Sequence, residues 1–194
     1  MESSRPSAAI RPLDGITVVD LSQNLAGPYC AQILADLGAE AVKVERPGTG
    51  DAARAWGPPF WEGEGTIFLA ANREKRSLAL DLKSEAGRRI LFRLLERADV
   101  LVESFRAGSA ERLGVGWAEV HEHNPRLIYC SVTAFGPRGP LHERPGYDPL
   151  AQAFSGLISV TGHPGHPPAR VGTSVIDYGT GVWGAVGVLG ALLE

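Results

Sequence analysis

The sequence predicts an α/β fold with a largely parallel, Rossmann-like sheet and flanking helices. Two observations lead to this prediction. Short β-branched runs alternate along the chain with longer segments whose apolar residues recur at helical spacing. Near the N-terminus, strand, helix and strand follow one another closely, which is the βαβ arrangement of parallel strands. The 194 residues are 44% hydrophobic and 21% charged, a composition typical of a globular chain.

The first βαβ unit is expected over residues 16–45. The β-branched run at 16–21 is typical of a buried strand, and a second such run follows at 41–45. Pro28 fits the first turn of the intervening helix, because that position needs no N–H donor. Gly38 is expected to end this helix just after residue 37.

A long loop is expected next, over residues 46–64, and long loops inside compact domains are usually functional. Ser84 can cap the helix that follows it, and this helix has one apolar face. That face consists of Ile90, Leu91, Leu94 and Leu95. Further strands are expected at 77–82, 99–103 and 127–132, and further helices near 109–113 and 117–123.

The last third of the chain combines loops with apolar helices. A loop rich in Pro, Gly and Arg at 136–146 precedes an apolar segment at 149–160 that is expected to be helical. The terminal helix carries a ridge of glycines at every third residue, which allows another element to approach closely: Gly181, Gly184, Gly187 and Gly190. Its apolar pattern continues to Leu193 without a cap, so we expect a fragment or a subunit completed by another chain.

Composition and motifs exclude several classes of protein. The net charge of −3 creates no field that would gather nucleic acid or anionic lipid. Cys30 and Cys130 are expected to be free thiols, and the five histidines lack metal-ligand spacing, so no metal site is predicted. Residues 1–12 are expected to be a disordered tail without the apolar core of a signal peptide. The apolar stretch 182–193 is shorter than the roughly 20 residues of a membrane span, so a soluble, cytoplasmic protein is expected.

No nucleotide-binding or hydrolase motif occurs in the position that its function requires. No GxGxxG opens a helix, and no GxxxxGK[ST] occurs, so the βαβ pattern alone does not imply a dinucleotide or a P-loop. The absence of GxSxG argues against an α/β-hydrolase.

Asp177 is the strongest candidate for a catalytic residue. It follows the β-branched pair Val175-Ile176 and precedes the glycine-rich helix. One interpretation is an ordinary helix cap, whose carboxylate accepts backbone N–H bonds. The other is a nucleophile, held ionised by the N–H groups of Gly179 and Gly181 and shielded from water by an apolar strand.

An ordered series of sequence blocks, taken together, resembles the CaiB–BaiF group, the family III CoA-transferases. The blocks lie at 13–20, 26–28, 38–54, 72–83, 98–108, 124–129, 144–148 and 177–181. The resemblance extends from Leu13 to Glu194. It implies that residues 13–194 form a CoA-binding α/β domain, the N-terminal part of the large CoA-transferase domain, incomplete at its C-terminus.

The resemblance assigns roles to individual residues. It makes Asp177 the nucleophile. The positions that would contact CoA are Leu25, Ala26, Arg46, Leu80, Asp81, Leu82, Lys83, Ser104, Phe105, Arg112, Leu113, Arg144 and Tyr147. Arg46 and Arg112 suit phosphate groups through forked, charge-assisted hydrogen bonds, and Phe105 offers a face for adenine. Family members often have glutamine where this chain has Leu25, which argues against an oxalate-like substrate.

The implied reaction is transfer of CoA between carboxylic acids through an aspartyl-CoA thioester on Asp177. CoA is then a co-substrate, and neither a permanently bound cofactor nor a metal is implied. The implied partners are an acyl-CoA, a carboxylate acceptor, and an interlocked homodimer or a second chain that supplies the missing half, without nucleic acid or membrane.

Two alternatives remain open. The racemase branch of the family has a histidine where this chain has Tyr147, and a tyrosine hydroxyl ordinarily titrates near pH 10, which makes it a poor base. The second alternative is a CoA-binding fragment without catalytic activity.

Overall fold

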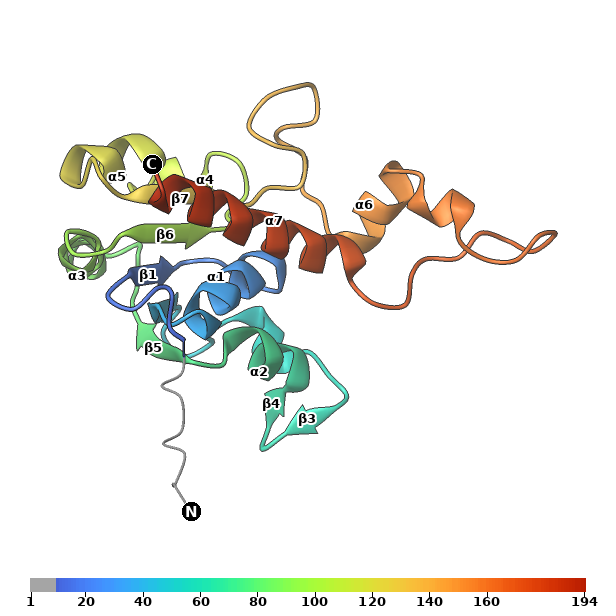
Figure 1. Cartoon of the computed structure of the whole chain (residues 1–194), viewed down its shortest axis with the longest axis horizontal. Coiled ribbons are helices and arrows are strands. Elements are labelled where there is room, and N and C mark those ends of the chain that lie inside the picture. The colour runs from blue at the N-terminus through green and yellow to red at the C-terminus, as the bar shows by residue number, and fades with distance from the viewer. Residues whose placement is uncertain (1–9) are drawn as a thin grey trace, which may run out of the picture.

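The fold is built on a five-stranded parallel sheet with the order β5-β2-β1-β6-β7 (Figure 1). The computed structural model describes residues 10–194, so most of the tail predicted for residues 1–12 lies outside the described residues. The strands are β1 (Thr17–Asp20), β2 (Glu40–Glu45), β5 (Lys75–Ala79), β6 (Val100–Glu103) and β7 (Ile128–Ser131). Taken in chain order, these five strands have the 3-2-1-4-5 arrangement of doubly wound sheets, which confirms the predicted fold class.

Helices cover both faces of the sheet. The helices are α1 (Ala26–Asp36), α2 (Thr66–Asn72), α3 (Glu85–Leu95), α4 (Ser109–Arg112), α5 (Trp117–His123), α6 (Asp148–Phe154) and α7 (Val175–Leu192), with 3-10 turns η1 (Ala52–Ala55) and η2 (Leu157–Val160). Successive residues of a strand face opposite sides, and β1 shows the result. Val18 lies in a core with α1 and α7, whereas Val19 lies in a core with α3, α4 and α5.

The three predicted helix boundary signals are confirmed. Pro28 lies in the first turn of α1, and Gly38 follows the helix with a φ of +107°, a conformation that favours glycine. The Ser84 hydroxyl accepts a hydrogen bond from Gly87 N at 3.0 Å and so caps α3. On the apolar face of α3, Leu91 and Leu95 are fully buried.

Strand β5 and the loop before it differ from the prediction. The strand occupies Lys75–Ala79 rather than 77–82, because Asp81 O accepts from both the backbone N–H and the hydroxyl of Ser84 and turns the chain into α3. The predicted loop at 46–64 contains η1 and a two-stranded antiparallel hairpin, β3 (Phe60–Trp61) and β4 (Glu64–Gly65).

The segment before α7 also differs. Helix α6 ends at Phe154 instead of continuing to residue 160, because Gly156 adopts a φ of +81° before η2 begins. Val175 and Ile176, expected in a strand, form the first turn of α7. In Figure 1, α6 and the loop after it extend away from the sheet, and α7 then returns to lie beside α1.

The glycine ridge of α7 is only half used for close packing. A Cβ on Gly181 would lie 2.8 Å from Ala26 O, and a Cβ on Gly184 would lie 3.1 Å from Cys30 Sγ. Gly187 and Gly190 have no such neighbour within 4 Å in the described part of the chain. The ridge therefore brings the first half of α7 into contact with α1.

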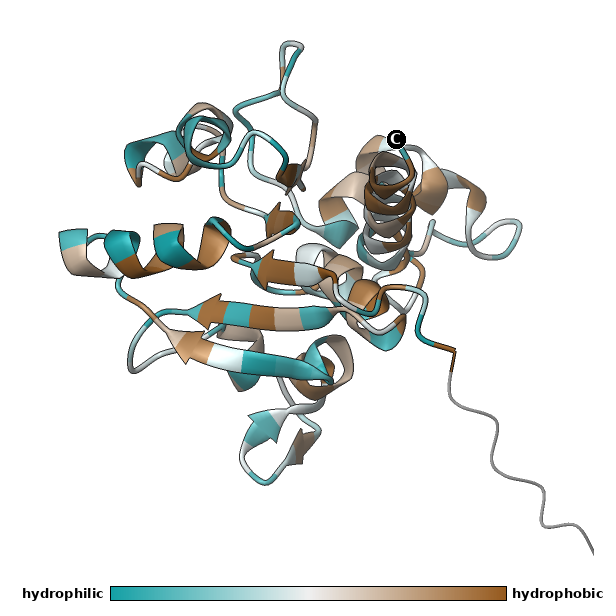
Figure 2. Ribbon diagram, turned by 60° about the vertical axis from the view of Figure 1, so that its left-hand side comes forward, coloured by the Kyte–Doolittle hydropathy of each residue, from teal (hydrophilic) through white to brown (hydrophobic). Residues whose placement is uncertain are grey.

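The outer side of α7 remains apolar and exposed, and Trp183 is 74% accessible. Figure 2 shows the apolar colouring along this helix. Within residues 10–194, α7 is the one helix that is long and apolar enough to cross a membrane. It is longer than the apolar stretch 182–193, which by itself is too short for a span. Length and composition alone are weak evidence, and the first half of α7 packs on α1.

Candidate active site

The candidate site lies at the carboxyl ends of the parallel strands. In doubly wound sheets, ligands bind in the crevice where the strand order reverses, which here is between β1 and β6. The loops after these two strands meet at that point, where Ser104 Oγ accepts from Gln23 N at 3.0 Å. Leu25 and Ala26 begin α1 directly after this contact.

The loops after β2 and β5 meet at the same edge of the sheet. Leu80 N donates to Glu45 O at 2.9 Å, which places residues 80–83 beside the start of the loop that carries Arg46. Arg46 and Lys83 are exposed cations there. The edge therefore collects nine of the thirteen predicted CoA-contact positions: Leu25, Ala26, Arg46, Leu80, Asp81, Leu82, Lys83, Ser104 and Phe105.

The remaining predicted contact residues lie in two other places. Arg112 is exposed at the end of α4, where its Nη2 donates to Ser109 Oγ at 2.6 Å, and Leu113 follows it. Arg144 is exposed in the loop before α6, and Tyr147, at the start of that helix, is 59% accessible. Phe105 packs partly against the core beneath α3, so part of its ring is already covered.

A buried ionic network lies beneath this edge, and sequence reasoning did not find it. Lys43 and Lys75 converge on Asp20, with Nζ–Oδ2 distances of 3.6 and 2.9 Å. Lys43 Nζ also lies 2.9 Å from Asp51 Oδ2. Burial alone would raise the pKa of Asp20, but the two ammonium groups and the Ser22 hydroxyl lower it to about 2.

The same network fixes the loop between β1 and α1. Lys43 Nζ donates to Ser22 O at 2.9 Å, and Lys75 Nζ donates to Pro28 O at 2.7 Å. Asn24 N donates to Asp51 Oδ1 at 3.0 Å. Because these contacts surround Leu25 and Ala26, the network determines where the start of α1 lies.

Asp177 occupies the third position of α7 and is half-buried. Burial and the nearby Asp148 carboxylate raise its pKa to about 6. The expectation that the amides of Gly179 and Gly181 hold it ionised was wrong. Both residues lie inside α7, where each N–H bonds the carbonyl four residues earlier.

The start of α7 lies against the start of α1. The rings of Tyr29 and Tyr178 meet edge to face with centroids 4.9 Å apart. Gly181, one turn after Asp177, lies so close to Ala26 O that a Cβ on it would be only 2.8 Å away. The residue that follows Asp177 and the next turn of α7 therefore lie against the start of α1, although the two helices are far apart in the sequence.

Asp148 is a second site residue to which the sequence gave no role. Its side chain is buried, and its Oδ2 accepts from Ile176 N at 2.8 Å and from Asp177 N at 3.3 Å. The carboxylate that caps α7 thus comes from α6 rather than from Asp177. No local sequence signal indicates this contact, because the two segments are 28 residues apart.

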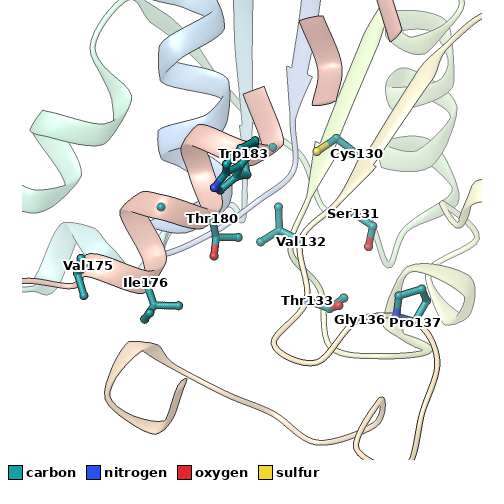
Figure 3. Close-up of a pocket in the computed structure, with 12 residues that line it drawn as sticks. Cys130, Ser131, Val132, Thr133, Gly136, Pro137, Val175, Ile176, Thr180 and Trp183 are labelled. Atoms are coloured by element: carbon teal, nitrogen blue, oxygen red, sulfur yellow. The ribbon is translucent and has the colours of Figure 1, made fainter. Parts of the chain in front are cut away.

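An open, largely apolar cavity of about 590 Å³ adjoins the same turn of α7. It lies between α7 and the segment that continues from β7, and Figure 3 shows Ile176, Thr180 and Trp183 facing Val132 and Thr133 across it. Asp177 is not among the residues that line it. The cavity therefore lies next to Asp177 but does not include it.

Comparison with known proteins gives one consistent result. The family model described as CoA-transferase family III matches residues 13–194. Succinyl-CoA:glutarate CoA-transferase from Mus musculus is 42% identical over 96% of this chain and 43% of its own length. Acetyl-CoA:oxalate CoA-transferase from Acetobacter aceti is 43% identical over 99% of this chain and 49% of its own length.

A solved structure matches both the fold and the sequence. The crystal structure of a CAIB/BAIF family protein from Brucella suis superimposes with a TM-score of 0.90 at 43% identity. The match covers 94% of this chain and 49% of that one. The chain therefore spans about half the length of the relatives that it matches.

Proposed function

Because this chain belongs to the family III CoA-transferases, we propose that it forms the CoA-binding part of an enzyme that moves CoA from an acyl-CoA thioester to a carboxylic acid. The observation that carries the proposal is the position of Asp177. Asp177 is half-buried in the first turn of α7, and the next turn of that helix lies against the start of α1, where the first loop of the carboxyl edge ends. Partial burial strips water from a carboxylate and so favours its attack on an acyl group.

The proposed reaction begins when a carboxylate oxygen of Asp177 attacks the thioester carbon of the donor. The C–S bond breaks, which gives a mixed anhydride and CoA thiolate. The thiolate then attacks the Asp177 carbonyl carbon, releases the donor as its free carboxylate and leaves an aspartyl-CoA thioester. The acceptor carboxylate attacks the carbonyl carbon of this thioester and displaces CoA thiolate, which gives a second anhydride. The thiolate then attacks the acceptor acyl carbon of that anhydride, forms the new acyl-CoA and releases Asp177 as a carboxylate.

The names of two relatives pair CoA with short dicarboxylic acids, namely succinate with glutarate in one and oxalate in the other. Succinate and glutarate are therefore the first acceptors to test, since Leu25 argues against an oxalate-like substrate. Position 147 argues against the racemase alternative, because a tyrosine stands there instead of a histidine base.

CoA is proposed to lie along the carboxyl edge of the sheet, with its phosphates near the exposed guanidinium groups of Arg46 and Arg112. Since the chain spans about half of its relatives' length, we propose that further sequence or a second copy completes the active site and that the working enzyme is a dimer.

Replacing Arg46 or Arg112 with alanine is expected to weaken CoA binding by about ten- to a hundredfold, since a charged hydrogen bond contributes about 1–3 kcal/mol. Calorimetric titration of the full-length protein with CoA measures the change. Arg126→Ala is the matched control, because this exposed arginine precedes β7 at the opposite, amino edge of the sheet. If all three variants bind CoA with the affinity of the parent, neither Arg46 nor Arg112 contacts CoA.

The rate of transfer is expected to fall as the pH drops below about 6. The pKa of Asp177 is raised to about 6, so its nucleophilic carboxylate is present above that pH and is lost by protonation below it. We expect kcat/KM to decrease about tenfold per pH unit on the acidic side. A pH–rate profile between pH 4.5 and 8, with circular dichroism at each pH to verify folding, tests this. A flat profile would show that no group with this pKa limits the reaction.

A further inference from the structure

Two buried polar side chains of α6 reach across to the segment that leads into α7. Asp148 and Gln152 lie one helical turn apart, and both are almost fully buried. Gln152 Nε2 donates to Asp148 Oδ1, which joins the two side chains into one unit. Buried polar groups of this kind need partners, and here the partners are backbone groups of another element.

The pair holds the segment from 171 to 177 at both ends. Gln152 Oε1 accepts from Val171 N at 2.8 Å, and Gln152 Nε2 also approaches Thr173 O at 3.4 Å. At the other end, Asp148 Oδ2 accepts from Ile176 N and Asp177 N. The two side chains therefore fix the direction in which the chain enters α7.

Helix α7 depends on this contact because its own cap position supplies none. Ser174 makes no side-chain capping hydrogen bond, so the first N–H groups of the helix require another acceptor. The Asp148 carboxylate provides it and places a negative charge at the positive end of the helix dipole. Little else restrains the approach to α7, since residues 163–170, 172 and 173 are exposed.

We propose that Asp148 and Gln152 form a polar clamp that positions Asp177 for attack on the thioester. The inference rests on the proposed function, because the clamp can affect catalysis only if Asp177 is the nucleophile. Neither residue takes part in bond making. Both act through the backbone, and Asp177 itself is one of the three residues whose N–H the clamp binds. A displacement of the nucleophile by about 1 Å is enough to cost about a hundredfold in rate.

Gln152→Ala removes the hydrogen bonds to Val171 and Thr173 and leaves the Asp148 oxygen in place. Asp148→Asn keeps an oxygen for Ile176 N but turns an amide NH₂ toward Gln152 Nε2, where two donors then oppose each other. The double variant Asp148→Asn/Gln152→Glu restores a donor–acceptor pair between the two side chains. The introduced carboxylate also accepts from Val171 N.

In the full-length protein, both single variants are expected to lower kcat for CoA transfer by about ten- to a hundredfold while the KM for the acyl-CoA changes little. The double variant is expected to recover part of the kcat lost in Asp148→Asn. Hydrogen exchange should show faster exchange in a peptide covering 171–178 in the single variants. Because the double variant restores activity without restoring the native residues, it remains informative if one single variant folds poorly.

Gln32→Ala is the matched control. Gln32 is a buried glutamine on α1 with an aspartate partner at the same spacing, Asp36, which accepts from its Nε2 at 2.8 Å. This variant is expected to retain kcat and normal exchange at 171–178. If the parent transfers CoA and Gln152→Ala has the same kcat, the clamp proposal is wrong and the proposed function stands. If the parent transfers no CoA from any acyl-CoA, the proposed function is wrong, and the proposed role of the clamp in catalysis is wrong as well.

Discussion

Replacing Asp177 with asparagine in the full-length protein is expected to abolish CoA transfer, with a loss of about 10⁴-fold or more, as for other covalent nucleophiles. An amide is a very poor nucleophile at carbon and cannot form the acyl anhydride. Rates of exchange between an acyl-CoA and a carboxylate acceptor measure the effect. In the parent, hydroxylamine added during turnover should modify Asp177 alone, as peptide mass spectrometry would show.

The stability of the same variant separates a nucleophile from a structural residue. The pKa of Asp177 is raised in the folded state, so its contribution to stability is full below the unfolded value of 3.8 and is lost as the pH rises through about 6. At pH 7 the ionised carboxylate therefore opposes folding, and asparagine relieves that cost. Tm should be equal to or higher than the parent's at pH 7, with a smaller difference near pH 4. Retained exchange together with a marked fall in Tm would make Asp177 a structural residue.

Replacing Lys43 with methionine is expected to destabilise the protein by about 3–5 kcal/mol, the usual cost of breaking a buried ion pair from one side. Lys43 is 1% exposed and is the only ammonium group within 4 Å of the Asp51 carboxylate in the described part of the chain. Its removal leaves that carboxylate uncompensated and frees Ser22 O from its donor. Urea denaturation measures the loss of stability.

Arg76→Ala is the control for the Lys43 variant. The pair between Arg76 and Glu40 has the same type of charges at a distance of 2.9 Å, but its two side chains are 71% and 63% exposed. An exposed pair contributes at most about 1 kcal/mol, so this variant should unfold at nearly the same urea concentration as the parent. Similar small losses in both variants would mean that water reaches Lys43.

Most of the sheet could be predicted from the sequence because β1, β2, β6 and β7 carry β-branched residues between helices of clear periodicity, whereas β5 has none and its bounds were predicted wrongly. The network around Lys43 could not, because a lysine in the middle of a strand looks like a residue on an exposed face. The role of Asp177 remains a prediction, and the surroundings expected for it were wrong. The pair Val175-Ile176 has strand propensity, whereas the tertiary contact with Asp148 stabilises a helical turn there. The CoA-contact positions remain predictions, although most of them lie along one edge of the sheet.

The contact between Gly181 and Ala26 O limits how this protein can change shape. Two helices that meet without a side chain between them cannot slide past each other without steric overlap. The start of α1 is in turn tied to the sheet through Lys75. Helix α7, helix α1 and the sheet should therefore move as one rigid body. Any opening and closing around a substrate then falls to the loops on either side of α6, at 136–147 and 155–170, because Asp148 and Gln152 hold α6 itself to the start of α7.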